Sequence, residues 1–246
     1  MLLLLACTTS TKSDPNRVAD TAPQTQSLSA QDVLSELRAD RDGTLQKYSR
    51  NAGWPLPVEE GFLMVCTENR LNYAAGDFDG WAGTPLTQEA GFSWAVVTAT
   101  PGDHYKWTDL ADRWEADPWA QSYTYDEFGE ISLMEPSEAH LERFYGFGSD
   151  TLEERTLRVW VPAETPDRTL YVHDGQNLFD PEAIWGGWHL QDSVPPGMML
   201  VGIDNTAARM DEYTHTQDDI GGLYGGQADA YADLIETSIR PFIADH

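Results

Sequence analysis

The sequence is poor in cysteine, in basic residues and in long apolar runs, and each shortage excludes a class of protein. Its 246 residues include 2 cysteines, Cys7 and Cys66, too few for a disulfide framework. Lysine and arginine number 15 against 41 aspartate and glutamate residues, which gives a formal net charge of -26. Such a chain lacks the cations that neutralise nucleic-acid phosphates or hold an anionic bilayer surface. No apolar stretch approaches the roughly 20 residues that a membrane-spanning helix needs.

What the sequence does contain is enough for a folded core. The chain has a mass of 27.4 kDa, with 41% hydrophobic and 23% charged residues, so wholesale disorder is excluded. This length suits one large or two ordinary domains. We divide the chain into a signal and tether over 1–29, a first domain over 30–126, an inter-domain connection over 127–155 and a second domain over 156–246.

The N-terminal segment is typical of a targeting signal followed by a flexible tether. Met1 to Ala6 is apolar, and residues 8–29 are rich in Thr, Ser, Gln and Asp. Leu4-Leu5-Ala6-Cys7 resembles the lipobox of bacterial lipoproteins, which implies that Cys7 carries a lipid and anchors the chain to the outer membrane, at the cell envelope. The basic residues that usually begin such a signal are missing, so a trimmed ordinary signal peptide is the alternative.

The first domain combines one helix with a small β-sandwich. Ser29 is suited to cap a helix from about Ala30 to Leu45, in which apolar residues recur at helical spacing. Short β-like runs separated by Gly, Pro, Asp and Asn then predict an antiparallel, immunoglobulin-like sandwich. These runs are Phe62 to Cys66, Leu71 to Ala75, Phe92 to Thr98 and His104 to Thr108.

Aromatic residues in this domain follow a specific order. The motifs are Ala75-Gly76-Asp77-Phe78-Asp79-Gly80-Trp81, Pro101-Gly102-Asp103-His104-Tyr105-Lys106-Trp107 and Arg113-Trp114-Glu115-Ala116-Asp117-Pro118. Their order resembles the glycogen-binding module of branching enzymes and of the AMP-activated kinase β subunit, a fold that also precedes the catalytic domain of enterochelin-esterase-like proteins. The resemblance implies that Trp81, Lys106 and Trp114 contact a glucan, with flat aromatic rings against sugar faces. Asp79 departs from the usual Asn, and a purely structural module is the alternative.

The connection and the second domain differ in pattern. The connection is acidic and is expected to be irregular, apart from a turn of helix over Ser137 to Phe144. The second domain contains apolar runs that predict strands buried in a parallel sheet. These runs are Leu157 to Val161, Thr169 to His173 and Met198 to Ile203. Gln227 to Ala244 predicts a helix, and Pro241 predicts a kink or a stop near its end.

Four motifs follow one another in the second domain. They are Arg158-Val159-Trp160-Val161-Pro162, Leu170-Tyr171-Val172-His173-Asp174-Gly175-Gln176-Asn177-Leu178-Phe179-Asp180, Val201-Gly202-Ile203-Asp204-Asn205 and Arg209-x-x-Glu212-Tyr213. In this order they resemble the esterase family that includes enterochelin esterase, feruloyl esterases and esterase D. The fold class we predict is therefore α/β plus β, an immunoglobulin-like β-sandwich followed by the front half of an α/β-hydrolase fold with a mainly parallel sheet.

The resemblance also implies roles for individual residues. Members of the family hydrolyse esters with a serine nucleophile, and backbone N–H groups stabilise the oxyanion of the tetrahedral intermediate. The backbone N–H of Gln176 would be one donor, and Gly175 would let the chain turn sharply enough to aim it. An ordinary Asp-Gly turn is the alternative. Arg209 and Glu212 would line the substrate cleft, although a buried Arg–Glu pair is the alternative for Glu212.

Three further residues are candidates at the same sheet edge. Trp185 and Trp188 lie in a glycine-rich stretch, where they would wall an aromatic substrate pocket. Packing of these two rings against the sheet is the competing interpretation. Asp204 follows a strand directly and is a candidate to support the oxyanion loop through backbone hydrogen bonds.

The nucleophile that this chemistry requires is absent from the sequence. No Gly-x-Ser-x-Gly motif occurs, and the near match Gly91-Phe92-Ser93-Trp94-Ala95 belongs to a β-like run of the first domain. The acid and the histidine of the family also lie downstream of that motif. We therefore interpret the chain as a C-terminally truncated fragment of an esterase, inactive by itself, with an unpaired sheet edge that lowers its solubility.

The function we predict is a serine carboxylic-ester hydrolase that acts at the cell envelope and needs no cofactor and no metal. Its small-molecule substrate is a carbohydrate, aromatic-acyl or siderophore ester. The alternative is a glucan-binding surface lipoprotein with a non-catalytic hydrolase-like domain. A third hypothesis, metal-dependent hydrolysis, is weak because no two candidate ligands have the spacing of a known metal site. Those candidates are His173, Asp174, Asp180, Asp218 and Asp219.

Overall fold

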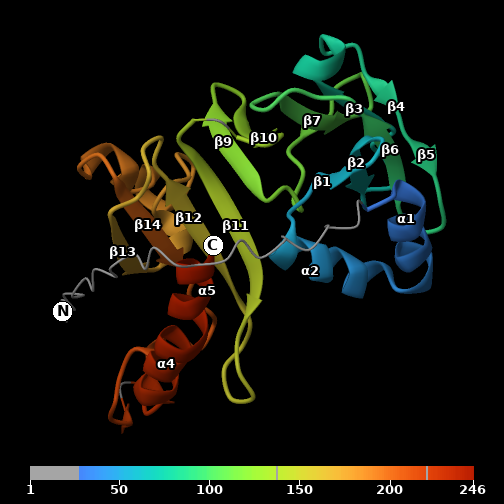
Figure 1. The fold of residues 1–246 in the computed structure, drawn as a ribbon. Coiled ribbons are helices and arrows are strands. Elements are labelled where there is room, and N and C mark those ends of the chain that lie inside the picture. The colour runs from blue at the N-terminus through green and yellow to red at the C-terminus, as the bar shows by residue number, and fades with distance from the viewer. Residues whose placement is uncertain (1–27, 137, 220) are drawn as a thin grey trace, which may run out of the picture.

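The structure of the chain is a computed structural model that describes residues 28–136, 138–219 and 221–246 (Figure 1). The helices of the first half are α1 (Ala30–Ala39), α2 (Arg41–Asn51) and η1 (Asp77–Asp79). Its strands are β1 (Leu56–Val58), β2 (Gly61–Cys66), β3 (Tyr73–Gly76), β4 (Thr84–Pro85), β5 (Thr87–Gln88), β6 (Ser93–Val97), β7 (His104–Thr108), β8 (Trp114–Glu115), β9 (Ser122–Asp126) and β10 (Gly129–Leu133).

The second half alternates strands with short helices. Its strands are β11 (His140–Phe147), β12 (Arg155–Val161), β13 (Arg168–His173), β14 (Met198–Ile203), β15 (Asp218–Asp219) and β16 (Leu223–Tyr224). Its helices are η2 (Gly175–Asn177), η3 (Ile184–Gly186), η4 (Leu190–Ser193), α3 (Arg209–Glu212), α4 (Ala228–Leu234), η5 (Ile235–Ile239) and α5 (Arg240–Asp245).

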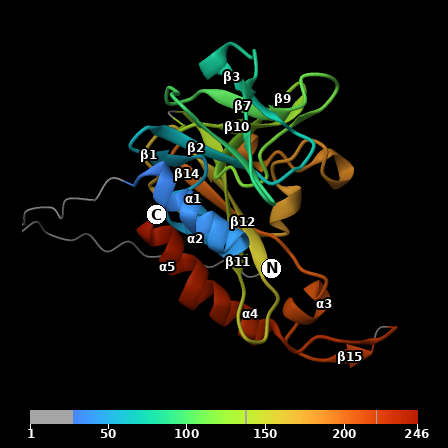
Figure 2. The same cartoon turned by 90° about the vertical axis from the view of Figure 1, so that its right-hand side faces the viewer.

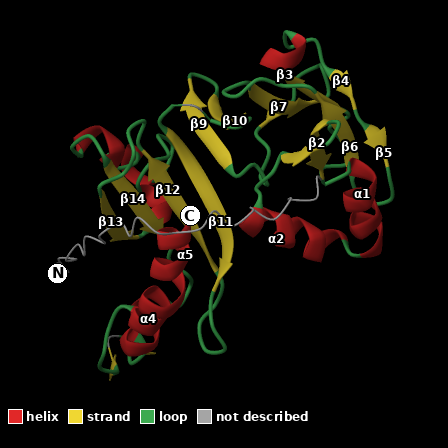
Figure 3. Ribbon diagram, viewed as in Figure 1, coloured by secondary structure: helices red, strands yellow, loops and turns green. Residues whose placement is uncertain are grey.

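One ten-stranded sheet runs through both halves of the molecule (Figure 3). Its strands lie in the order β13-β14-β12-β11-β9-β10-β7-β3-β4, with β8 beside β7. A four-stranded sheet in the order β1-β2-β6-β5 belongs to the first half, and β15 pairs with β16 in a hairpin. Every β-like run that the sequence predicts coincides with one of these strands to within a few residues.

The direction of the strands differs from the prediction. Among the described strands, β13 and β14 are the one parallel pair of the large sheet, and β12 runs antiparallel to both of its neighbours, β11 and β14. The predicted mainly parallel sheet is therefore wrong, and the large sheet is mainly antiparallel. The reason is that β11 precedes β12 as a hairpin partner and extends the sheet into the antiparallel first half.

The connection between the halves is also more ordered than the sequence suggested. It contains β10 and β11, so its expected irregularity is wrong. The predicted turn of helix is wrong from His140 onward, where β11 begins, and Ser137 lies outside the described residues. Tertiary pairing decides this segment, because β11 is hydrogen-bonded on both sides, by β9 and β12.

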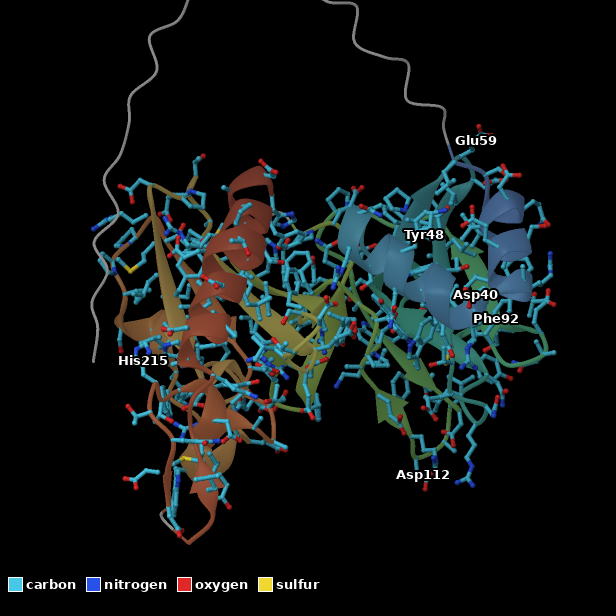
Figure 4. The ribbon with its side chains drawn as sticks, turned by 90° about the horizontal axis from the view of Figure 1, so that it is seen from below. Asp40, Tyr48, Glu59, Phe92, Asp112 and His215 are labelled. Atoms are coloured by element: carbon cyan, nitrogen blue, oxygen red, sulfur yellow. The ribbon has the colours of Figure 1, made fainter. Side chains whose placement is uncertain are left out.

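Two apolar cores cover the two faces of the small sheet. Between the sheets, Met64 of β2 packs in one core with Trp107 of β7. On the outer face, α1 and α2 bring Leu34 and Tyr48 into a second core with Phe92 (Figure 4). The first half is thus a three-layer arrangement of helices, small sheet and large sheet.

The predicted single helix over Ala30 to Leu45 is instead two helices. The predicted Ser29 cap is confirmed, because its side chain accepts a hydrogen bond from the backbone N–H of Asp32. Asp40 is extended, with φ of -151°, and ends α1. Its carboxylate then accepts the N–H of Gly43 at 3.0 Å and so caps α2. One aspartate therefore separates two helices because it satisfies the free N–H groups of the second.

The C-terminal helices cover one face of β12 and β14 (Figure 2). Tyr231, Ile239 and Ile243 pack there with Val159 and Val201. The chain passes through Pro241 without the predicted stop, because the π-helical segment η5 precedes it. In that segment the backbone N–H of Arg240 reaches the carbonyl of Ile235. This wider register gives a proline near the start of α5 room that an α-helical interior lacks.

The N-terminal signal stays a prediction. Cys7, the lipobox and the tether up to residue 27 lie outside the described residues. Within the described part of the chain, no helix combines the length and the apolar character needed to cross a bilayer.

A buried carboxylate lies in the core of the first half. Asp117 is 1% exposed and accepts hydrogen bonds from the hydroxyl of Tyr105 and the N–H of Trp119, both at 2.8 Å. Burial disfavours its charged form more than these bonds favour it, and the pKa of Asp117 rises to about 6. Protonation of Asp117 is therefore favoured by folding.

We predict that Asp117 lowers the stability of the fold as the pH rises. A raised carboxyl pKa contributes stability below its ordinary value of about 4, and this contribution is lost as the pH passes 6. Relative to Asp117→Asn, wild type should lose up to about 3 kcal/mol of unfolding free energy between pH 4 and pH 7. Denaturant unfolding of both proteins measures the difference, with exposed Asp112→Asn as the control (Figure 4). A difference independent of pH contradicts the prediction.

Candidate active-site edge and aromatic pocket

The parallel pair β13 and β14 brings two loops together at its carboxyl end. His173 pairs with Ile203 at the last register position, so the residues that follow these strands lie side by side. The side-chain oxygen of Gln176 accepts the backbone N–H of Asn205 at 3.2 Å. The side-chain amide of Asn205 donates to Asp174 at 2.7 Å. This edge is where α/β sheets place their ligands.

Gly175 lets the loop lie close against β14, but it does not make the turn itself. The residue with left-handed backbone is Asp174, with φ of 59°. Gly175 is buried, and a Cβ there would lie 2.6 Å from the carbonyl carbon of Gly202 and 2.8 Å from the Asp204 carboxylate. A side chain at this position would therefore push the loop away from β14. The sharp turn assigned to Gly175 from the sequence belongs to Asp174.

The backbone N–H of Gln176 belongs to the first turn of the short helix η2, which begins at Gly175. The turn bonds of this segment run from Asn177 N to Asp174 O at 2.9 Å and from Leu178 N to Gly175 O at 3.2 Å. Neither bond occupies the N–H of Gln176. The first N–H groups of a helical turn are free to bind an anion.

The carboxylate of Asp174 accepts hydrogen bonds from three residues of the stretch that follows β14. Arg209 donates through Nε and Nη2, both at 2.8 Å, and the hydroxyl of Tyr213 donates at 3.3 Å. With Asn205 on the same carboxylate, these hydrogen bonds, led by those of Arg209, lower the pKa of Asp174 to about 2. Arg209 thus lies at the carboxyl end of β13 and β14, where the sequence predicted it. Its side chain is partly exposed, and its guanidinium pairs with Asp174.

The side chain of Glu212 is buried in an ion pair. Its side chain and that of Arg155 are both 0% exposed, and the guanidinium nitrogens lie 3.0 and 2.8 Å from the two carboxylate oxygens. The hydroxyl of Thr206 donates to the same carboxylate at 3.0 Å. Substrate cannot reach a group so enclosed, so the cleft-lining role predicted for Glu212 is corrected to the alternative buried pair. Its partner is Arg155 of β12, which sequence spacing could not identify across 57 residues.

Trp185 and Trp188 project from the loop between η2 and η4. Trp185 is 91% exposed and Trp188 is 51% exposed, so packing against the sheet is wrong for both. The N–H of Trp188 donates to the carbonyl of Asn177 at 2.9 Å, which holds this loop beside η2. The predicted support from Asp204 takes a different form, because its carboxylate pairs with Arg158 at 3.0 Å.

Sequence reasoning missed an aromatic group next to the loop. The ring nitrogen Nδ1 of His173 lies 3.0 Å from the hydroxyl of Tyr231 on α4. The ring of Tyr213 lies 5.0 Å from His173 and 5.4 Å from Tyr231, centroid to centroid. Desolvation lowers the pKa of His173. The sequence predicts the helix that carries Tyr231, but helical periodicity gives no signal for a partner 58 positions away.

A second cluster, the aromatic pocket, lies on the first half. It has a volume of about 420 Å³ and is lined by Trp81, Lys106, Trp114, Asp126, Phe128 and Ile131. The structure therefore brings together the three residues that the motif resemblance singled out. The two tryptophan rings are tilted, with centroids 6.1 Å apart. The ammonium of Lys106 donates to the carbonyl of Phe128 at 3.2 Å.

Two details of the aromatic pocket were not foreseen. Phe128, at the turn between β9 and β10, is 78% exposed and forms a third aromatic wall. Asp79 accepts the N–H groups of Gly76 and Gly83, each at 3.0 Å, and so shapes the loop that carries Trp81. The two N–H groups reach different oxygens of the carboxylate, and Asp offers two acceptor oxygens where the usual Asn has one.

Within the described ranges, no three His, Cys, Asp or Glu side chains group as ligands for a metal ion. Ser93 of the near-match motif lies in β6 and is 3% exposed, so the assignment of that motif to a strand of the first half is confirmed.

Comparison with known proteins gives distant structural resemblance. No family model and no curated protein sequence matches the chain. An IroE-like serine hydrolase from Shewanella oneidensis is 24% identical with a TM-score of 0.33, over 43% of this chain and 38% of that one. A ferric enterobactin esterase from Salmonella typhimurium is 11% identical with a TM-score of 0.29, over 80% and 65%. The Shigella flexneri enterobactin esterase with enterobactin is 13% identical with a TM-score of 0.28, over 80% and 64%.

The coverage of those solved structures is incomplete. This chain spans 38%, 65% and 64% of their lengths, which is less than two thirds in each case.

We predict that the buried and the exposed pair at this edge differ in their contribution to stability. Glu212→Ala leaves the buried charge of Arg155 without a partner and should lower the unfolding free energy by about 3–5 kcal/mol. Arg209→Ala removes a partly exposed pair and should cost less than about 1 kcal/mol. Chemical denaturation of both variants tests this contrast. Equal losses of unfolding free energy in the two variants would contradict the structural role of Glu212.

Proposed function

We propose that this chain is the front part of a serine carboxylic-ester hydrolase that acts at the cell envelope, held there by a lipid on Cys7. The observation that carries the proposal is the loop after β13, where the N–H of Gln176 is left free by the turn bonds. Gly175 lets this loop lie against β14 with no side chain in between. The proposal needs no metal and no cofactor.

The loop would supply half of an oxyanion site. During ester cleavage the carbonyl oxygen gains negative charge, and a backbone N–H aimed at that position lowers the barrier. Gln176 N–H is such a donor, and Asn205 fixes the side chain of the same residue. The 246 residues contain no Gly-x-Ser-x-Gly motif to supply the nucleophile, so they should not hydrolyse esters by themselves.

The side chains at this edge favour an aromatic-acyl or carbohydrate ester over a strongly anionic one. The exposed rings of Trp185 and Trp188 offer apolar surface beside η2. Arg209 is already neutralised by Asp174, and the chain carries a net charge of -26. A ferric siderophore ester would therefore meet repulsion with little local compensation.

The oxyanion role predicts a specific effect of Gly175→Ala. In the complete product of the reading frame that contains this sequence, the added Cβ displaces the loop from Gly202 and misplaces the N–H of Gln176. The loss of one oxyanion donor should lower kcat about 100- to 1000-fold with a smaller change in KM. Hydrolysis of p-nitrophenyl and feruloyl esters measures it.

The control for general destabilisation is Gly129→Ala. Gly129 has φ of +90°, and its Cβ would meet open space far along the sheet, so this variant is strained without touching the loop. It should keep its kcat. Absence of a Gly-x-Ser-x-Gly motif beyond His246 in the reading frame, or activity unchanged by Gly175→Ala, would refute the hydrolase proposal.

We propose glucan binding in the aromatic pocket as a second function. It is favoured by the convergence of Trp81, Trp114 and Lys106 around one cavity of about 420 Å³. Flat rings present apolar surface to pyranose faces, and the ammonium of Lys106, with one of its hydrogens on the carbonyl of Phe128, has others to offer hydroxyl groups. This function requires no nucleophile and suits the chain by itself.

We predict that Trp81→Ala and Trp114→Ala each weaken retention on amylose or glycogen. Each variant removes one wall of the aromatic pocket, and stacking on a ring contributes energy of the order of 1 kcal/mol, so affinity should fall at least about fivefold. Affinity electrophoresis with soluble glycogen gives the comparison. Trp185→Ala removes a tryptophan that is 91% exposed elsewhere and should bind as wild type does. Unretained wild type would exclude this function.

A further inference from the structure

Glu142 lies between two histidines on the large sheet. It belongs to β11, is 8% exposed, and its two carboxylate oxygens face different partners. Oε1 lies 3.1 Å from Nε2 of His140, two residues earlier on the same strand. Oε2 lies 2.7 Å from Nε2 of His246, at the end of α5. One carboxylate thus joins β11 to the residue that caps the end of α5.

Aromatic packing orients the ring of His246. It stacks on Phe242 with an angle of 7° between planes, at 5.9 Å between centroids. It also meets Phe144 of β11 edge to face at 4.8 Å. With these two uncharged rings around it, Glu142 is the charged group that faces His246 across the gap.

The hydrogen bonds of the cluster show which ring nitrogens of the two histidines need a hydrogen. His140 directs Nδ1 to the carbonyl of Glu138 at 2.7 Å and Nε2 to Glu142, and both of these oxygens are acceptors. The ring therefore fills both bonds when both nitrogens carry hydrogen. His246 needs one hydrogen, on Nε2, for its bond with Glu142. A second proton makes the ring of His246 an imidazolium, and its attraction to the Glu142 carboxylate then adds to the hydrogen bond.

The same helical segment has a second attachment at its other end. Tyr231 of α4 contacts His173, which directly precedes Asp174 in the loop after β13. The segment α4-η5-α5 is continuous from Ala228 to Asp245. The position of the helix end on β11 is therefore connected to the packing beside the candidate loop.

We propose that Glu142 and His246 form a pH-responsive latch that holds α5 on β11 and weakens as His246 loses its proton. The titratable groups that face one another are Glu142 and His140 from β11 and His246 at the end of α5. At low pH the imidazolium of His246 is paired with the buried carboxylate. At high pH the neutral ring keeps a single hydrogen bond, so α5 opens more often without unfolding the chain.

The direction of the effect follows from the shifts in the cluster. Burial opposes ionisation of Glu142, but hydrogen bonds from His140 and His246 hold its pKa at about 2, so it stays charged across the working range. The hydrogen bond with Glu142 outweighs burial and raises the pKa of His246. The latch therefore stabilises docking of α5 fully below the ordinary histidine value of about 6.5 and loses this contribution as pH rises through the raised value.

Hydrogen exchange of the full chain at several pH values tests the latch. After correction for intrinsic exchange rates, protection of residues 240–246 in wild type should fall between pH 5.5 and pH 8.5. The fall should be about tenfold for each unit by which folding raises the pKa of His246. Protection of residues 228–234 should fall in parallel, because both ends belong to one helical segment.

Two variants separate charge from packing. His246→Gln removes the titrating group, and Glu142→Gln removes its charge while the aromatic stack on Phe242 remains. Each should make the protection of α5 independent of pH. His215→Gln breaks an exposed pair with Asp229, at 75% and 92% exposure, and should keep the wild-type profile (Figure 4). A wild-type profile without pH dependence, or one that His246→Gln leaves unchanged, overturns the proposal.

Discussion

The pairing of β11 with β9 is the constraint on which the second half of the molecule depends. Leu141 pairs with Tyr123, so the strands of the second half continue the large sheet of the first. Buried backbone groups need hydrogen-bond partners, and the shared sheet supplies them across the junction. Arg143 reinforces this junction, because its guanidinium lies 3.8 Å from the ring centroid of Tyr123 and pairs with Glu130.

This shared sheet separates the two candidate sites and fixes their surroundings. The aromatic pocket lies on β7, β8 and the β9–β10 turn, whereas the loop with Gln176 follows β13 at the far end of the strand order. Each site combines loops or turns with the ends of strands in this sheet, and the strands fix where those loops begin and end. The helical segment from α4 to α5 connects the loop to β11, since Tyr231 contacts His173 and His246 contacts Glu142.

Much of the local structure could be predicted from the sequence. The runs that became β2, β7, β12, β13 and β14 alternate or are continuously apolar, and such patterns depend on near neighbours. The convergence of Trp81, Lys106 and Trp114 also followed from motif order. The division at Asp40 was missed because the helical pattern continues on both sides of a residue whose side chain caps the second helix.

The sequence by itself determined the strands β2, β7, β12, β13 and β14, the position of the Asp174-Gly175 loop and the absence of a nucleophile motif. Only the tertiary structure decided that the large sheet is mainly antiparallel, that Glu212 is buried against Arg155 and that Glu142 joins two histidines. The physical reason is the separation along the chain of the residues that interact. Periodicity records the burial of a residue by its own element, but strand direction and ion pairs depend on groups that are distant along the chain.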